Sequence, residues 1–509
     1  MLTKIMTATL AGVEGKPVVV EADIHRGLPS LTVVGLADTT IKEACGRVRP
    51  AILNSGYDFP AGRVTINLVP AGSPKEGSHF DLPIAIGIIA LCTGGSGFIG
   101  ADTAFLGEIS LDGRINAIKG ALPLVMCLRK SGVKNVIVPE DNAAEVSILP
   151  DVNIFPASCL AQAAEHALGN IAIEPYKEVY SFKKKKSAVD FSQVTGQETA
   201  KRAVTIGAAG NHGIMFMGSP GCGKTMIARR IPTILPSLTY EEKLEITGIY
   251  SVAGLLDNEE PIVSERPFRN PHHTISPAAL VGGGVRPRPG EISLAHRGVL
   301  FLDELGEFDI KTIDAMRQPI EEGMVRIRRL SEEAVFPAQV MVVAAANPCK
   351  CGNLWDDRKI CSCSRKQIDT YMKKLSGPFS DRIDIHVRMN PVSREDIERE
   401  EKGKLSCSSE EMRRRVMRAI ETQRGRYENT SFTYNGGLDE DGIKKFCRLD
   451  RSSSRLMSDA YDKLGLTMRA YNKVLKVSRT IADLEGEEFV REEHVAEALT
   501  YRADTAAAG

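Results

Sequence analysis

The sequence predicts a multidomain α/β chain with three structured parts. Over residues 1–175, short strand-like runs alternate with glycine-rich turns and a few helical stretches, which is typical of an α+β domain. Over residues 190–390, strand and helix patterns alternate regularly, which favours a three-layer α/β domain. Residues 391–509 are helical and charged in pattern, so we expect a small helical domain there. A basic linker over residues 176–189 joins the first two parts.

Charge and composition exclude several classes of protein. The 65 basic and 65 acidic residues cancel, so polyanion binding would depend on local patches rather than on an overall field. The longest apolar run, Leu82–Cys92, is too short to cross a bilayer, and the N-terminus lacks a secretory pattern. We therefore expect a soluble cytoplasmic protein without membrane contact, whose eleven cysteines are reduced or metal-bound.

The N-terminal part contains four clear strand patterns, in which β-branched residues dominate. They are Val18–Asp23, Leu31–Val34, Arg63–Leu68 and Asn135–Pro139. The linker that follows this part carries four consecutive lysines, Lys183–Lys186. Such a run is either a solvated connector or a patch that binds DNA phosphates.

The most informative stretch of the central part fits the pattern G-x-x-x-x-G-K-[ST]. An apolar strand pattern, Ile214–Met217, precedes it, and a helix pattern begins after it. In such a loop the backbone N–H groups cradle phosphates, the lysine neutralises the β- and γ-phosphates, and the hydroxyl binds Mg²⁺. The alternative is a glycine-rich loop that binds nothing. The predicted nucleotide-binding residues are Gly218, Ser219, Pro220, Gly221, Cys222, Gly223, Lys224 and Thr225.

A second motif predicts what happens to the bound nucleotide. The apolar run Gly298–Leu302 ends in Asp303 and Glu304, as expected for a buried parallel strand with carboxylates at its end. Asp303 would hold Mg²⁺ together with Thr225, and Glu304 would polarise the attacking water. The two motifs together predict ATP hydrolysis, with ATP and Mg²⁺ as cofactors.

Five further segments carry a resemblance to a known family. They are Phe191–Gln197, Arg269–Ser276, Arg288–His296, Ala346–Cys349 and Asp381–Asp384. With the two nucleotide motifs, they make residues 190–505 resemble AAA+ ATPases of the magnesium-chelatase-like group, and within it the ComM/YifB branch. The resemblance implies a P-loop AAA+ core followed by a helical lid.

The resemblance also implies roles for side chains on the nucleotide side of the domain. Val194, Gly196 and Gln197 match the segment that lines the adenine pocket in AAA+ proteins. Asn347 follows the apolar run Val340–Ala346, where the family keeps its polar sensor of the γ-phosphate. An amide at the end of this strand would orient the lytic water beside Glu304.

Two arginines match catalytic positions of the family. Arg382 fits the arginine finger that reaches a neighbouring subunit, and Arg469 fits the second sensor in the lid. A finger supplied in trans changes hydrolysis rates by several orders of magnitude. The alternative for each arginine is a surface ion pair of little energetic weight. Sites shared between subunits imply a homo-oligomeric ring, and the family favours a hexamer.

Two glycine- and arginine-containing segments are candidates for DNA binding. Residues 322–329 alternate basic and apolar side chains, as in a β-hairpin, and match a hairpin that this AAA+ clade inserts. Residues 281–288 lie in the region of the clade's other insertion. Arginines on such hairpins would hold phosphates, and subunit packing is the alternative. The candidate DNA-binding residues are Arg286, Arg288, Arg326, Arg328 and Arg329.

Four cysteines form two C-x-C pairs directly after Asn347. Four thiolates can close a tetrahedral zinc site, although the spacing within each pair is tighter than usual. We expect a structural Zn²⁺, with free cysteines as the alternative. The candidate ligands are Cys349, Cys351, Cys361 and Cys363. For the histidine pair His272–His273 we favour a structural or nucleotide-coupling role over metal binding.

The N-terminal part resembles the proteolytic domain of Lon-type proteases, which use a serine activated by a lysine. The likeness lies in the segments 74–81, 107–115 and 133–140. Aligned on these, the nucleophile position falls on His79, with Ser78 one place early. The lysine position falls on Leu122, with Lys119 out of register. Both members of the dyad are therefore missing, and we expect a platform for ring formation or ligand binding.

These observations favour an ATP-driven hexameric ring motor acting on DNA. The family resemblance implies helicase or branch-migration work in recombination of incoming DNA, with DNA and recombination proteins as partners. A protein-remodelling ATPase like the magnesium-chelatase motor subunit is the alternative, and its ATPase would be indifferent to DNA. An ATP-dependent protease is excluded by the missing dyad.

Overall fold

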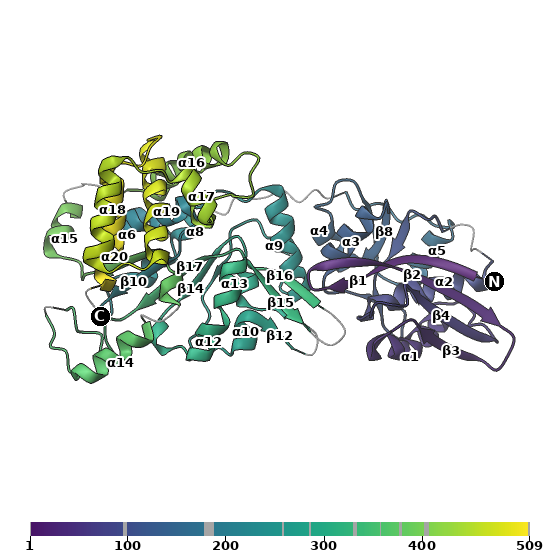
Figure 1. The fold of residues 1–509 in the computed structure, drawn as a ribbon. Coiled ribbons are helices and arrows are strands. Elements are labelled where there is room, and N and C mark those ends of the chain that lie inside the picture. The colour runs from purple at the N-terminus through teal and green to yellow at the C-terminus, as the bar shows by residue number, and fades with distance from the viewer. Residues whose placement is uncertain are drawn as a thin grey trace.

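The computed structural model describes residues 2–94, 99–177, 188–256, 259–284, 287–328, 333–356, 358–375, 379–401 and 407–506. Figure 1 shows two lobes. The N-terminal residues form one lobe, and the central α/β residues form the other together with the C-terminal helices. Among the described residues, the structure contains no helix with the length and apolar character needed to cross a membrane.

The N-terminal lobe is built on a mixed sheet with the strand order β3-β4-β2-β1-β5-β8-β9. The pairs β1–β2 and β2–β4 are antiparallel, and the other pairs are parallel. The strands are β1 (Leu2–Ala11), β2 (Glu14–His25), β3 (Ser30–Val34), β4 (Arg63–Val69), β5 (Thr103–Phe105), β8 (Asn135–Pro139) and β9 (Asn153–Ala157). A small hairpin joins β6 (Glu108–Ile109) to β7 (Ile115–Asn116). All four strand patterns predicted for this part are confirmed.

Helices cover this sheet, and helix α2 is buried on nearly all sides. Almost every residue of α2 is buried, because a helix that is apolar on all sides must pack on all sides. It contacts β1, β2, α1 and α5. The helices of the lobe are α1 (Thr39–Asn54), α2 (Asp81–Cys92), α3 (Ala121–Lys130), α4 (Glu140–Val146) and α5 (Leu160–Ala167).

The central domain contains a parallel sheet with the order β11-β14-β17-β10-β18. Its strands are β10 (Ile214–Gly218), β11 (Phe268–Arg269), β14 (Val299–Leu302), β17 (Met341–Ala346) and β18 (Ile385–Met389). All residues of β14 and β17 are buried, as expected for strands covered on both faces. Because the strands are parallel, the loops after β10, β14 and β17 meet at one edge of the sheet.

Helices and two small hairpins surround this sheet. The helices are α6 (Glu198–Gly210), α7 (Lys224–Ala228), α8 (Ile231–Ile234), α9 (Tyr240–Ala253), α10 (Pro277–Val281), α11 (Glu291–Leu294), α12 (Ile310–Ala315), α13 (Arg317–Glu322) and α14 (Arg365–Leu375). The hairpins are β12 (Gly282–Gly283) with β13 (Arg288–Pro289), and β15 (Met324–Arg328) with β16 (Glu333–Pro337). The second hairpin confirms the pattern predicted for residues 322–329 as far as Arg328.

The C-terminal residues are helical, as predicted. The helices are α15 (Arg394–Glu401), α16 (Ser409–Arg426), α17 (Glu440–Phe446), α18 (Arg451–Leu464), α19 (Met468–Glu485) and α20 (Glu492–Ala506). Side chains of Ser408, Asp450 and Thr467 cap the starts of α16, α18 and α19. Val416 and Ile481 share one hydrophobic core with Val204 of α6, so the helical part packs directly on the α/β part.

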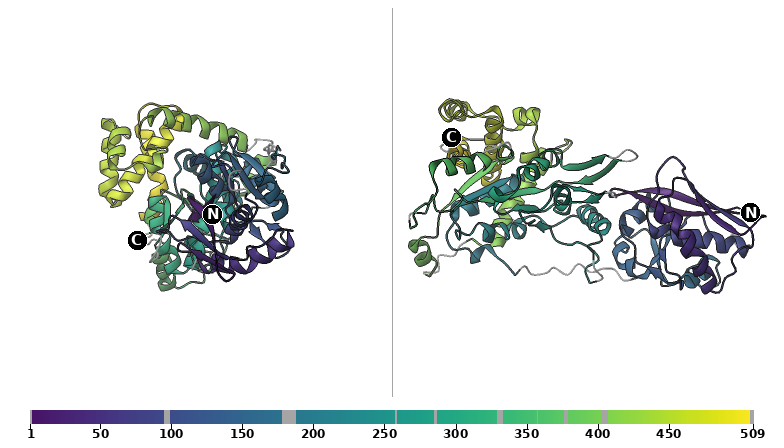
Figure 2. Two further views of the ribbon diagram at one scale, coloured as in Figure 1. Left: turned by 90° about the vertical axis from the view of Figure 1, so that its right-hand side faces the viewer. Right: turned by 90° about the horizontal axis from the view of Figure 1, so that it is seen from below.

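Helix α9 connects the two lobes. The Gly120 N–H donates to Ser251 O at 3.1 Å, and Tyr240 Oη donates to Ile148 O at 2.8 Å. Leu244 lies in the hydrophobic core that α3 and α4 build in the N-terminal lobe. The hairpin β15–β16 also reaches this lobe, since Val335 packs against Gly12 in the β1–β2 turn (Figure 2). The contact between the lobes is therefore built from both apolar and polar groups.

Candidate nucleotide-binding site

The phosphate loop joins β10 to α7, as its sequence motif predicts. Gly221 and Gly223 adopt φ values of +83° and +94°, a left-handed backbone that favours glycine. A Cβ atom built on either residue would meet no atom within 4 Å. Glycine is thus required here by the backbone conformation, while the space above the loop is open to a ligand.

Lys224 points across the loop toward the end of the neighbouring strand. Its Nζ atom donates to Gly218 O at 2.6 Å, to Ser219 O at 3.0 Å and to Asn347 Oδ1 at 3.1 Å. Burial lowers the pKa of Lys224 from its ordinary value. The structure thus brings the predicted phosphate-binding lysine and the predicted sensor amide into direct contact.

The two predicted magnesium ligands also meet. Thr225 Oγ1 donates to Asp303 Oδ2 at 2.8 Å, so the hydroxyl after the lysine and the carboxylate after β14 face the same point. A hydroxyl and a carboxylate are oxygen ligands that suit Mg²⁺. A cavity of about 430 Å³ opens beside them. Its lining includes Pro220, Gly221, Gly223, Lys224, Thr225, Asp303, Glu304 and Asn347.

Glu304 adopts a left-handed backbone, with φ at +53°. Its N–H donates to Asp303 Oδ1 at 3.0 Å, and its side chain is 59% exposed. His273 Nδ1 lies 3.6 Å from Glu304 Oε2, and the rings of His272 and His273 are 4.1 Å apart. The sequence favours a structural or nucleotide-coupling role for this histidine pair. Its contact with Glu304 adds His273 to the site, on the side of the carboxylate that would polarise water.

The predicted adenine segment is tied to the phosphate loop. Gln197 Nε2 donates to Cys222 O at 3.1 Å and to Asn390 O at 2.7 Å. Gly196 and Gln197 both have positive φ, which turns the chain sharply before α6. Val194 and Cys222 are buried in the same core, so they support the site from beneath, and burial raises the pKa of the Cys222 thiol.

The structure does not bring Arg382 and Arg469 to this cavity. Arg382 Nε lies 2.9 Å from Glu321 Oε1, and Arg469 contacts the same oxygen at 3.4 Å. Arg382 precedes β18, which runs parallel to β10, so it lies at the edge of the sheet opposite the phosphate loop. Because β10 has five residues, the two edges are separated by roughly 15 Å of strand.

The candidate DNA-binding arginines are exposed and partly paired with acids. Arg326 and Arg328 on β15 are 42% and 78% exposed, and both lie near Glu333 of β16, at 3.8 Å and 3.1 Å. Arg326 is also 3.6 Å from Glu322. Arg288 is exposed on β13. Arg286 and Arg329 lie outside the described residues.

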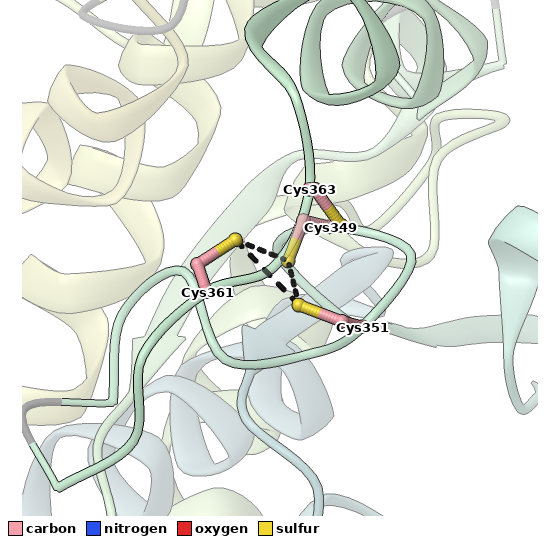
Figure 3. Close-up of side chains that lie close together, drawn as sticks. All are labelled: Cys349, Cys351, Cys361 and Cys363. Carbon is pink, nitrogen blue, oxygen red and sulfur yellow. Dashed lines mark hydrogen bonds between the residues drawn. The ribbon is translucent and has the colours of Figure 1, made fainter.

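The four predicted zinc ligands are brought together (Figure 3). Cys349 Sγ lies 3.4 Å from Cys351 Sγ and 3.7 Å from Cys361 Sγ, and the last two atoms are 3.5 Å apart. All four sulfur atoms, including that of Cys363, lie within 4.8 Å of one another. Cys349 is buried and the other three are half-buried.

The residues nearest to a Lon-type dyad have other partners. Ser78 Oγ donates to the carboxylate of Glu108, and His79 Nε2 lies 2.8 Å from Ala8 O. Leu122 is buried, and the side chain of Lys119 extends to Gly254 in the other lobe. Ser78 and Lys119 thus point toward different partners, as expected for a domain without the dyad.

Comparison with known proteins identifies the family of the chain. A family model described as magnesium chelatase, subunit ChlI, matches residues 190–397. Models described as subunit ChlI of Mg-chelatase and as magnesium chelatase, subunit ChlI C-terminal, match residues 20–142 and 406–502.

Full-length relatives agree with these matches. Competence protein ComM of Haemophilus influenzae is 40% identical over 498 residues, which cover 97% of this chain and 96% of that protein. Uncharacterized protein YifB of Escherichia coli is 40% identical over 508 residues, covering 99% and 97%. Lon protease of Rhizobium meliloti is 28% identical over 168 residues, covering 31% of this chain and 21% of that protein. The chain therefore belongs to the magnesium-chelatase-like AAA+ family, together with ComM and YifB, and its N-terminal region is similar to Lon proteases.

Proposed function

We propose that this protein is an ATPase in which ATP hydrolysis drives a hexameric ring along DNA. The carrying observation is the arrangement at one edge of the sheet, where Lys224 contacts Asn347 and Thr225 contacts Asp303. Lys224 binds the β- and γ-phosphates, Glu304 orients and polarises the attacking water, and Asn347 holds that water in line with the γ-phosphate. Thr225 and Asp303 would hold Mg²⁺, which would supply neutralisation of charge on the phosphates.

The position of the arginines supports hydrolysis at sites shared between subunits. Arg382 and Arg469 sit together on Glu321, on the far edge of the sheet from their own phosphate loop. A side chain of about 7 Å cannot cross roughly 15 Å of strand. Both arginines would therefore act on the nucleotide of a neighbouring copy, as an arginine finger does. A head-to-tail contact of this kind closes into a ring.

DNA is the substrate that the relatives and the charges favour. One relative is named as a competence protein, and competence is the capacity of a cell to take up and incorporate DNA. Arg326 and Arg328 expose their guanidinium groups on the β15–β16 hairpin, where they would hold phosphates. Helicase or branch-migration work on incoming DNA, alongside recombination proteins, fits this combination.

Protein remodelling is the second candidate. Each of the three family descriptions names a magnesium chelatase subunit, and Glu333 and Glu322 already pair with the hairpin arginines. A motor of this kind would act on a partner protein and would hydrolyse ATP at the same rate with and without DNA.

The deciding test compares ATP hydrolysis with single-stranded, duplex and branched DNA. We expect salt-sensitive stimulation by DNA, and we expect the triple variant Arg326→Ala/Arg328→Ala/Arg329→Ala to lose it. The double variant Arg451→Ala/Arg455→Ala, which removes two exposed arginines of α18, is the control and keeps the stimulation. A rate of ATP hydrolysis that is the same with and without each form of DNA would favour protein remodelling.

A further inference from the structure

The loop between β17 and α14 carries two cysteine pairs, from Cys349 to Cys363, and its four thiols converge (Figure 3). The sulfur–sulfur distances among Cys349, Cys351 and Cys361 are 3.4, 3.5 and 3.7 Å. A tetrahedral Zn²⁺ with Zn–S bonds of about 2.3 Å holds its sulfurs about 3.8 Å apart. A disulfide would need an S–S distance of about 2.05 Å. The distances between the thiols thus fit ligands of one shared metal ion and are too long for a disulfide bond.

The size of the cluster defines which metal group it can hold. Four sulfurs within 4.8 Å of one another enclose the volume of a single ion, and an iron–sulfur cluster needs wider spacing. Four thiolates fill a tetrahedral shell and leave no open position for water or substrate, which is the composition of structural zinc sites.

We propose that Cys349, Cys351, Cys361 and Cys363 bind one Zn²⁺, and that this ion holds the loop against both ends of the nucleotide pocket. The second half of this proposal rests on the ATPase function proposed above. The first half concerns only the four thiols and stands without it.

At the phosphate end, the loop packs directly on the phosphate loop. A Cβ built on Gly352 would lie 2.6 Å from Pro220 Cδ and 3.9 Å from Asn347 Cγ, so the Gly352 backbone approaches the Pro220 ring as closely as glycine permits. The first ligand, Cys349, follows Asn347 by only two residues. An ion bound to Cys349 and Cys351 would therefore fix the backbone that carries the sensor amide.

At the adenine end, the loop packs on β18, and the residue that follows this strand is hydrogen-bonded to Gln197. The ring of Trp355, between the two cysteine pairs, lies 4.7 Å from the guanidinium carbon of Arg388 on β18. Two residues further, Asn390 O accepts the hydrogen bond from Gln197 Nε2 at 2.7 Å. The loop thus touches the elements that position both the γ-phosphate sensor and the adenine segment.

Metal analysis of the purified full-length protein tests the first half. We expect about one Zn²⁺ per chain, and its loss in the double variant Cys351→Ser/Cys361→Ser. The control, Cys92→Ser, removes an exposed thiol of the N-terminal lobe and keeps the zinc. Exchange for Co²⁺ should give the absorption of a tetrahedral thiolate site. A wild-type protein with no zinc, with iron in its place, or with zinc that survives the double variant would overturn the proposal.

Nucleotide binding tests the second half. Trp355 is the only tryptophan of the sequence, so its fluorescence reports on the loop when zinc is removed from the wild-type protein by a chelator. We expect a change in this fluorescence together with roughly tenfold weaker nucleotide binding, both restored by added Zn²⁺. Unchanged nucleotide affinity after zinc removal would refute this half.

The variant Lys224→Ala separates the two proposals. It should keep zinc and the Trp355 signal while losing nucleotide affinity. If the wild-type protein binds zinc but no nucleotide, the ATPase function is wrong and the zinc site stands.

Discussion

Lys224 Nζ donates a hydrogen bond to Asn347 Oδ1 at 3.1 Å, across 123 residues of sequence. The contact joins the phosphate loop after β10 to the end of β17. The amide oxygen thus accepts a hydrogen bond from a half-buried ammonium that the phosphates of ATP would neutralise. We expect the phosphates of ATP to bind Lys224 in place of Asn347, so that the Asn347 amide can bind the attacking water.

Replacing Asn347 by alanine should therefore affect hydrolysis much more than binding. Nucleotide affinity should stay within a few-fold of the wild type, while the rate of hydrolysis falls about 100-fold, as for loss of one polar group that orients the transition state. Binding of a fluorescent nucleotide and steady-state hydrolysis measure the two effects. Glu304→Gln provides the comparison, with the same pattern. A loss of binding in Asn347→Ala would mean that its contact with Lys224 builds the pocket.

Mixing two inactive variants should restore activity if Arg382 acts on a neighbour. Arg382→Ala keeps its own phosphate loop, and Lys224→Ala keeps its own Arg382. In an equal mixture, about one quarter of the subunit contacts combine the intact loop of one with the intact arginine of the other. The hydrolysis rate of mixtures at several ratios measures this, with a maximum expected at equal amounts. Two variants that stay inactive at every ratio would contradict a shared site.

Gly223→Ala should weaken nucleotide binding by about tenfold or more, because alanine at φ of +94° costs about 1–2 kcal/mol of backbone strain. Gly132→Ala is a matched control, since Gly132 has φ of +90° and open space at the same position. Both variants should lose similar thermal stability, and only the first should lose nucleotide affinity. Equal nucleotide affinity in the two variants would show that the loop does not need its observed conformation.

The contact between the lobes should weaken as the pH rises, because of Glu145. Its carboxylate accepts hydrogen bonds from the Ser251 hydroxyl and from Leu122 N–H, and burial raises its pKa above the ordinary value. Between the ordinary and the raised pKa the folded state binds more protons than the unfolded state. The free energy of unfolding therefore falls as pH rises through this window.

Thermal unfolding of the wild type and Glu145→Gln between pH 4.5 and 8 measures this dependence. We expect the variant to lose the corresponding part of the slope, because glutamine does not titrate there. Glu140→Gln, at an exposed position of the same helix α4, should keep the wild-type slope. Identical slopes in the wild type and Glu145→Gln would contradict this account.

The parts of the site that a local pattern encodes were predicted from sequence. The phosphate loop and the strand ending in Asp303 follow from apolar periodicity next to glycines and carboxylates. The contact of Lys224 with Asn347 was not itself predicted, and it arises because strand ends of the parallel sheet share an edge. The convergence of the four cysteines was expected from their clustering as two C-x-C pairs, although the spacing within each pair is tighter than usual.

Relationships between distant elements could not be predicted in this way. The contact of His273 with Glu304, and the shared contact of Arg382 and Arg469 with Glu321, depend on how loops and helices pack around the sheet. No local periodicity encodes such packing. The attachment of α9 to the N-terminal lobe is missed for the same reason, because it depends on contacts with residues far away in the sequence. The domain boundaries stay predictions.

The attachment of α9 means that the central and C-terminal parts of the chain do not cover all of their own apolar surface. A shortened chain that starts near residue 190 would uncover Leu244 and leave Ser251 and Tyr240 without their partners in the N-terminal lobe. Such a protein would expose to solvent the apolar face of α9 that contacts the N-terminal lobe in the full chain, and exposed apolar faces promote association. Self-association measured on the shortened chain would then reflect that face, so the proposed ring assembly is better tested on the full-length protein.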